Sequence, residues 1–142
     1  MAQPGKHFDE GPGSPTKAAA RESEQNQLDF ELEYFSGLLQ RSPDYVDVLR
    51  IMGSLLSLKG LFTEGLKIDK KLVRLRPDDP LAHYNLACSY ALVKRADASI
   101  KTLRKAVELG YRDFRYMRED HDLDTIKQDP RFRQLLREFE EQ

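Results

Sequence analysis

The sequence predicts an all-α protein, a right-handed α-α superhelix built by stacking helical hairpins. The first observation is a repeat, because residues 80–113 align with residues 46–79 when they are shifted back by 34 positions. The second is that apolar residues recur at helical spacing through the chain, and the third is that proline or glycine stands where the helices would end. A repeat of this length indicates one helical hairpin that is used more than once and stacked on itself.

Composition limits the classes of protein to be considered. The chain has 142 residues, of which 39% are hydrophobic and 33% are charged, as in a soluble helical domain. Its net charge of −1 favours neither nucleic acid nor membranes, and no apolar run reaches the roughly 20 residues of a membrane span. Cys88 is the single cysteine, so no internal disulfide can form. The N-terminal sequence lacks a signal-peptide pattern, and we expect a cytoplasmic protein.

The chain is predicted to start with a disordered tail and to continue as one helical domain, residues 25–142. Residues 1–24 are rich in glycine and proline and nearly lack large apolar side chains. Four apolar residues from Leu28 to Leu39 then recur at i, i+4, i+7 and i+11, as on one face of a helix. This helix should end at Ser42, because the residue before a proline disfavours the helical conformation.

The first full repeat, about residues 46–79, is predicted to hold two helices. One covers about residues 45–58 and has Asp44 as its candidate N-cap. The other covers about residues 63–75 and has Thr63 as its candidate N-cap. The residues expected to end these helices are Gly60 and Pro77.

The second full repeat, about residues 80–113, is predicted to hold another pair. Asp78 or Asp79 is the candidate N-cap of its first helix, which begins next to a proline suited to a first helical turn. A turn at Lys94 separates it from a helix over about residues 96–109.

The remaining residues, 114–142, are predicted to cap the stack. The repeat fails here, because a further step of 34 residues would put Asp120 at a position that is apolar in both repeats. We expect an irregular aromatic and basic segment, a short helix over about residues 123–127, and a last helix that begins at Pro130. The whole chain then has about seven helices.

The two full repeats resemble the tetratricopeptide repeat (TPR) family, which alternates large and small residues at fixed positions. Over about 68 residues the resemblance rests on Leu49, Met52, Gly53, Leu56 and Gly65 in the first repeat, and on His83, Leu86, Ala87, Tyr90 and Ser99 in the second. Small residues are expected where two helices approach closely, which explains glycine inside a helix at Gly53 and Gly65. Asp69 and Leu72 depart from the pattern. The resemblance implies a non-enzymatic module that binds other proteins.

The resemblance also implies a concave face formed by the first helix of each repeat. The residues it places on that face are Asp47, Arg50, Ser54, Ser57, Leu81, Tyr84, Asn85, Cys88 and Ala91. On this hypothesis the face binds an extended peptide or a partner helix, with Arg50 and Asn85 as polar anchors and Tyr84 as an aromatic contact. The alternative is that the capping helices fill the groove. A clamp for the terminal carboxylates of chaperone tails is disfavoured, because Ser54 replaces its first asparagine.

Basic residues recur on the second helix of each repeat and suggest a different kind of binding. They are Lys67, Lys70, Lys71, Arg74, Lys101, Arg104 and Lys105. Stacking would align them as a convex ridge that could bind nucleic acid or an acidic partner, although a solvated helix face is the commoner meaning of such a pattern. Self-assembly through an uncapped end is a third possibility.

No motif for catalysis or for a metal is found in the sequence. Asp120, Asp122 and Asp124 have the spacing of a calcium-binding loop, but Thr125 stands in place of the required glycine and Arg131 in place of the last ligand. No second ligand pair accompanies His83 and Cys88 as a zinc site would require. We therefore expect a protein that is not an enzyme and needs no cofactor or metal. The sequence identifies neither its partner nor its oligomeric state.

Overall fold

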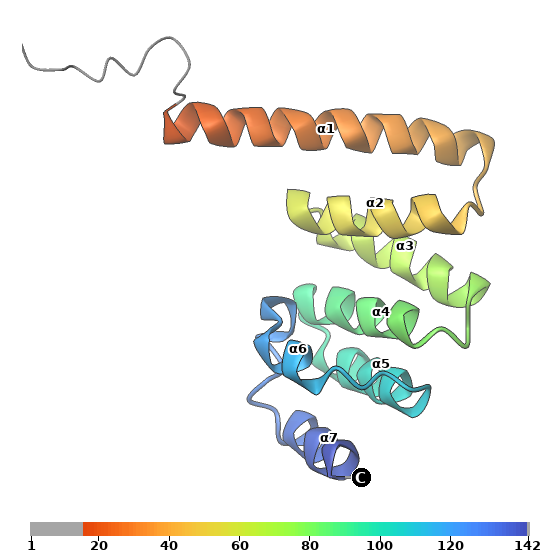
Figure 1. The fold of residues 1–142 in the computed structure, drawn as a ribbon, viewed down its shortest axis with the longest axis vertical. Coiled ribbons are helices and arrows are strands. Elements are labelled where there is room, and N and C mark those ends of the chain that lie inside the picture. Colours follow the sequence, from red (N-terminus) through yellow and green to blue (C-terminus); the bar gives the residue numbers. More distant parts are fainter. Residues whose placement is uncertain (1–15, 142) are drawn as a thin grey trace, which may run out of the picture.

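The computed structural model describes residues 16–141 as seven α-helices and one short 3-10 helix, with no strand among these residues. The helices lie one after another along the long axis, from α1 at one end to α7 at the other (Figure 1). The bounds are α1 Lys17–Arg41, α2 Val46–Lys59, α3 Phe62–Leu75, α4 Pro80–Leu92, α5 Ala96–Glu108, α6 Phe114–Glu119, η1 His121–Leu123 and α7 Pro130–Glu140. The predicted all-α helical repeat fold is confirmed.

Helix α1 begins earlier than the sequence predicted. Thr16 is its N-cap and accepts a hydrogen bond from the Ala19 amide at 3.1 Å. The predicted tail is therefore wrong for residues 17–24, which are helical because this cap and the alanine-rich segment after it favour a helix. Residues 1–15 of the predicted tail lie outside the described residues.

Helices α2 and α3 form the first hairpin, but neither starts with the predicted cap. The N-cap positions are Tyr45 and Leu61, and neither side chain bonds to the helix. Asp44 lies outside α2 and pairs instead with Lys71 of α3 at 3.2 Å. Thr63 lies inside α3. Both helices of this hairpin therefore begin without a side-chain capping bond.

Helices α4 and α5 form the second hairpin and follow the prediction closely. Asp79 is the N-cap of α4, and its carboxylate accepts hydrogen bonds from the amides of Leu81 at 2.9 Å and Ala82 at 3.4 Å. The turn after α4 places Lys94 in the left-handed region at φ 62°. In the interior, the Ser99 hydroxyl donates to the carbonyl oxygen of Ala87 at 2.7 Å, which joins the two helices at small residues.

The C-terminal cap differs from its prediction in two places. The aromatic segment forms α6, because Asp113 caps it by accepting a hydrogen bond from the Tyr116 amide at 3.0 Å. The helix predicted over residues 123–127 is absent, and the 3-10 helix η1 and turns occupy this region. Helix α7 begins at Pro130 as predicted. The signal for α6 was Asp113, a capping residue three positions before Tyr116.

The hydrophobic core has two parts. The larger joins the second hairpin to the cap and includes the fully buried side chains of Leu103, Met117, Leu123, Ile126 and Leu135. The smaller joins α1 to the first hairpin around Val48, Met52 and Leu56. Within residues 16–141, no helix has both the length and the hydropathy needed to cross a membrane.

Candidate partner-binding groove

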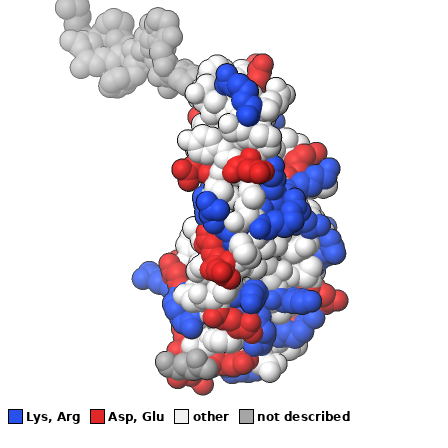
Figure 2. Space-filling view, turned by 90° about the vertical axis from the view of Figure 1, so that its right-hand side faces the viewer, with Lys and Arg blue, Asp and Glu red and all other residues white. Residues whose placement is uncertain are grey.

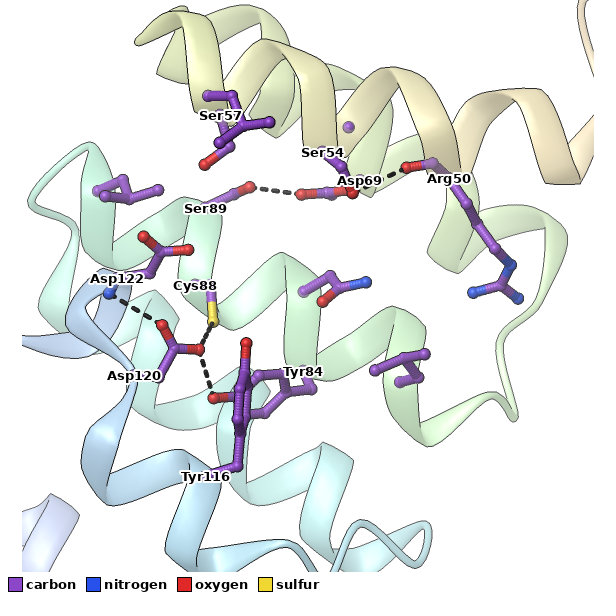
Figure 3. A pocket seen from close by; sticks show the side chains of 15 residues that line it. Arg50, Ser54, Ser57, Asp69, Tyr84, Cys88, Ser89, Tyr116, Asp120 and Asp122 are labelled. Carbon is purple, nitrogen blue, oxygen red and sulfur yellow. Dashed lines mark hydrogen bonds between the residues drawn. The ribbon is translucent and has the colours of Figure 1, made fainter.

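An open groove of about 680 Å³ lies between α2 and α4. Helix α3 contributes Asp69 to its lining, and the cap contributes Tyr116, Asp120 and Asp122 (Figure 3). The capping segment therefore forms part of the wall and leaves the groove open.

Most of the predicted concave residues line this groove. They are Arg50, Ser54, Ser57, Leu81, Tyr84, Asn85 and Cys88. Asp47 is exposed on α2 but is not part of the lining, and Ala91 is buried in the core below α4. Their placement follows from the helical period of α2 and α4, and their role in binding a partner stays a prediction.

Arg50 is held at the edge of the groove by an ion pair with Asp79, the N-cap of α4. Its side chain extends along the groove edge, away from Ser89 and Asp120 (Figure 3). Burial alone would raise the pKa of Asp79, but hydrogen bonds from Arg50 and from two amides of α4 outweigh it, so this pKa lies below its usual value. The predicted anchor Arg50 thus already has a partner within the chain.

Tyr84 is buried and forms the floor of the groove, with only 2% of its surface exposed. Its ring stacks on Tyr111 with the centroids 4.2 Å apart, and its hydroxyl donates to Asp120 at 2.7 Å. Burial raises the pKa of the Tyr84 phenol. Tyr84 lines the groove as the resemblance implied, but α6 and the segment before it cover most of its ring, and its role as an aromatic contact stays a prediction. Tyr116, which is 53% exposed, is a second aromatic side chain of the groove lining.

Cys88, Asp120 and Asp122 lie together at the cap end of the groove, with ligand atoms all within 4.8 Å of one another. Burial, together with both carboxylates, raises the pKa of the Cys88 thiol well above its usual value. Both oxygens of Asp120 already accept hydrogen bonds, from the Asp122 amide at 3.0 Å and from Tyr84. Both carboxylate oxygens of Asp120 thus have partners within the chain, and we assign no metal to this cluster.

Asp69 is a groove residue that reasoning from the sequence missed. It is 6% exposed, and it accepts a hydrogen bond from the Ser89 hydroxyl of α4. Burial raises the pKa of the Asp69 carboxyl to about 6, although the bond from Ser89 acts in the opposite direction. The sequence feature that could have identified Asp69 was its departure from the repeat pattern, because a charged residue stands where an apolar one was expected.

The basic residues of the second helices do not form a ridge free of acidic partners. Lys71 pairs with Asp44, and Arg104 pairs with Glu138 of α7 at 2.9 Å. Lys101, Arg104 and Lys105 line a second depression of about 600 Å³. Both basic and acidic side chains lie on the face shown in Figure 2, and the basic ones gather toward the right of that view.

Comparison with known proteins supports the fold. No family model matches the chain. Over 88 residues the chain is 32% identical to a chloroplastic protein of Arabidopsis thaliana, and the match covers 60% of this chain and 26% of that protein. The chain thus spans about a quarter of the length of this relative.

Two solved structures have a similar fold. The chain matches MamA (residues 41 to the end) from Desulfovibrio magneticus RS-1 with a TM-score of 0.60 at 20% identity, over 84% of this chain and 70% of that one. The "MamA RS-1 ArsTM double mutant" gives a TM-score of 0.58 at 18% identity, over 82% and 70%.

The predicted cytoplasmic location is contradicted, because the similar Arabidopsis protein is chloroplastic. That prediction rested on the lack of a signal-peptide pattern and on a single cysteine, and neither property selects one compartment. The stacked hairpins and the similar solved structures together support one conclusion, which is that this chain has a TPR-like helical-repeat fold.

Proposed function

We propose that the chain is a non-enzymatic protein-interaction module that holds a segment of a partner protein in the groove between α2 and α4. The observation that carries this proposal is the groove itself, about 680 Å³ in volume and left open by the cap. Pockets of about 300–1,000 Å³ are the usual size for specific binding of small ligands, so the groove suits a short peptide segment.

The lining offers what a peptide segment needs. The Asn85 amide can both donate and accept hydrogen bonds, which matches the alternating groups of an extended backbone. Leu58 and Leu81 are exposed apolar side chains beside it, and Tyr116 adds an aromatic surface. Mixed polar and apolar linings of this kind are typical of sites that bind peptides.

Selection from a random-peptide display library, with the full chain as bait, tests the proposal. We expect enriched peptides whose binding is lost in Ser54→Trp, because the indole would fill the groove from an exposed position of α2. Thr63→Trp is the matched control, since it adds the same bulk on α3 outside the groove. Enriched peptides that bind both variants equally would contradict the proposal, as would a selection that enriches nothing.

Binding of nucleic acid or another polyanion through the basic residues of α3 and α5 is the competing function. Such binding should weaken steeply between roughly 50 and 200 mM salt, because it releases several counterions. It should also weaken in the double variant Lys101→Ala/Lys105→Ala. Groove binding should survive both changes. The pairing of Lys71 and Arg104 with acidic residues reduces the positive potential and supports the groove instead.

The likeness to a chloroplastic protein supports a plastid as the place where this module works. Detection of the endogenous protein in purified plastids would agree with this proposal, and its recovery elsewhere would oppose it.

A further inference from the structure

The groove carries an imbalance of charge. Asp69, Asp120 and Asp122 line it, whereas Arg50 is its one cationic lining residue within the described part of the chain. The Arg50 guanidinium is paired with Asp79 at the edge (Figure 3). Three carboxylates therefore face the groove with no basic side chain of its lining to neutralise them.

Two of these carboxylates have capacity to accept further hydrogen bonds. Asp69 is more than nine-tenths buried, and among the described residues its Oδ2 accepts a bond from Ser89 while its Oδ1 accepts none. Asp122 is half-buried, and no side chain among the described residues donates to its carboxylate. Burial, followed by the neighbouring carboxylates of Asp120 and Asp124, raises the pKa of Asp122, as expected for an acid without a positive partner.

We infer that the groove binds a partner segment that carries a basic residue, and that the lysine or arginine side chain lies between Asp69 of α3 and Asp122 of the capping segment. This inference rests on the proposed function, because it states which kind of peptide the groove selects. A cation there would donate charge-assisted hydrogen bonds to oxygens for which the described residues supply no donor.

The side chains around the groove suit a basic side chain better than a free metal ion. Leu58, Leu81 and Tyr116 offer apolar surface over which the methylene stem of a lysine or arginine could pack. The face of the Tyr116 ring adds a favourable site for the charged group. A bare divalent ion has no methylene stem to pack on these side chains, and burial together with both carboxylates raises the pKa of the Cys88 thiol beside them.

Three pools of short random peptides test the inference on the full chain, each pool having lysine, norleucine or glutamate fixed at its centre. We expect the lysine pool to bind about tenfold more tightly than the norleucine pool, the effect of one charge-assisted hydrogen bond. The glutamate pool should bind most weakly. Equal binding of all three pools, blocked by Ser54→Trp, would overturn the inference and leave the proposed function standing. Failure of every pool to bind would overturn both.

Variants of the two aspartates test whether they cause the preference for lysine. Asp122→Asn and Asp69→Asn keep the shape of each side chain and should each remove most of the preference for lysine over norleucine. Glu119→Gln is the matched control, because it removes one charge from the same capping segment at an exposed site outside the groove. Thermal unfolding of each variant checks that it is folded. A preference that survives both aspartate variants would overturn the inference. The last experiment titrates the chain with Zn²⁺ or Ca²⁺ alone. Binding of a metal ion that displaces the lysine pool would overturn the inference in favour of a metal site.

Discussion

Gly53 of α2 faces Asp69 of α3 so closely that a Cβ atom on the glycine would lie 2.9 Å from Oδ1 of the aspartate. The glycine and the buried charge are therefore one feature of the first hairpin. Gly65, which lies inside α3, has only ordinary contact, with the Leu56 Cβ 3.7 Å from the position of an added Cβ. The expectation that packing explains the glycines holds strictly for Gly53.

This contrast predicts opposite effects of the same substitution. Gly65→Ala should stabilise the protein by up to about 1 kcal/mol, because alanine favours a helix and fits the space. Gly53→Ala should destabilise it by about 1–2 kcal/mol, because the cost of moving Asp69 exceeds that gain. Urea unfolding of the two variants measures both, and equal effects would contradict the assigned contact.

Asp69 should make stability depend on pH. Its pKa is about 6 in the folded chain and near its ordinary value of 3.8 in the unfolded chain, so the folded state binds the proton more tightly. The free energy of unfolding should therefore fall as pH rises from about 4 to about 6 and then level off. A difference of about two pKa units corresponds to about 3 kcal/mol.

Asp69→Asn isolates this effect, because asparagine has no proton to lose and can still bond to Ser89. The stability of the variant relative to the natural protein should rise by about 3 kcal/mol between pH 4 and pH 7, as followed by urea unfolding. Glu119→Gln changes an exposed site, so the stability of this variant relative to the natural protein should stay constant between pH 4 and pH 7. If the relative stability of Asp69→Asn also stayed constant with pH, burial would not raise the pKa of the Asp69 carboxyl.

Substitution of Tyr84 should lower the stability of the fold. Tyr84→Phe removes the hydrogen bond to Asp120 but keeps the stack on Tyr111, and should cost about 1 kcal/mol. Tyr84→Ala should cost about 3–5 kcal/mol, because it leaves a cavity in the larger core cluster. Tyr116→Phe is the control and should change stability little, since its ring is half-exposed. Thermal unfolding curves compare the three variants. A loss of stability below about 1 kcal/mol for Tyr84→Ala would contradict the burial of this ring.

Asp79 should matter more as a helix cap than as an ion pair. Asp79→Ala removes the cap of α4 and should cost about 1–2 kcal/mol. Asp79→Asn keeps a capping oxygen and loses the charge, so it should cost less than about 1 kcal/mol, the range for a partly exposed pair with Arg50. Asp78→Ala is the control, because Asp78 is exposed and does not cap the helix. Equal losses for Asp79→Ala and Asp79→Asn would mean that the charge dominates.

The sequence by itself determined the repeat, the helices and much of the core. Apolar spacing and breakers such as Gly60 act within a few residues, where backbone hydrogen bonds are made, and this is why the hairpins and the cap Asp79 could be predicted. The residues of the concave face came from the resemblance to the TPR family, and most of them line the groove.

Only the tertiary structure decided which side chains meet in the groove. Asp69 bonds to Ser89, which is 20 residues away in the chain, and Tyr84 bonds to Asp120, which is 36 residues away. Such contacts depend on how one hairpin is set against the next and on where the cap folds back, and a pattern of residues along one helix does not encode either. For this reason the burial of Tyr84 under the cap was not predicted, and Asp69, a departure from the repeat, became part of the candidate site.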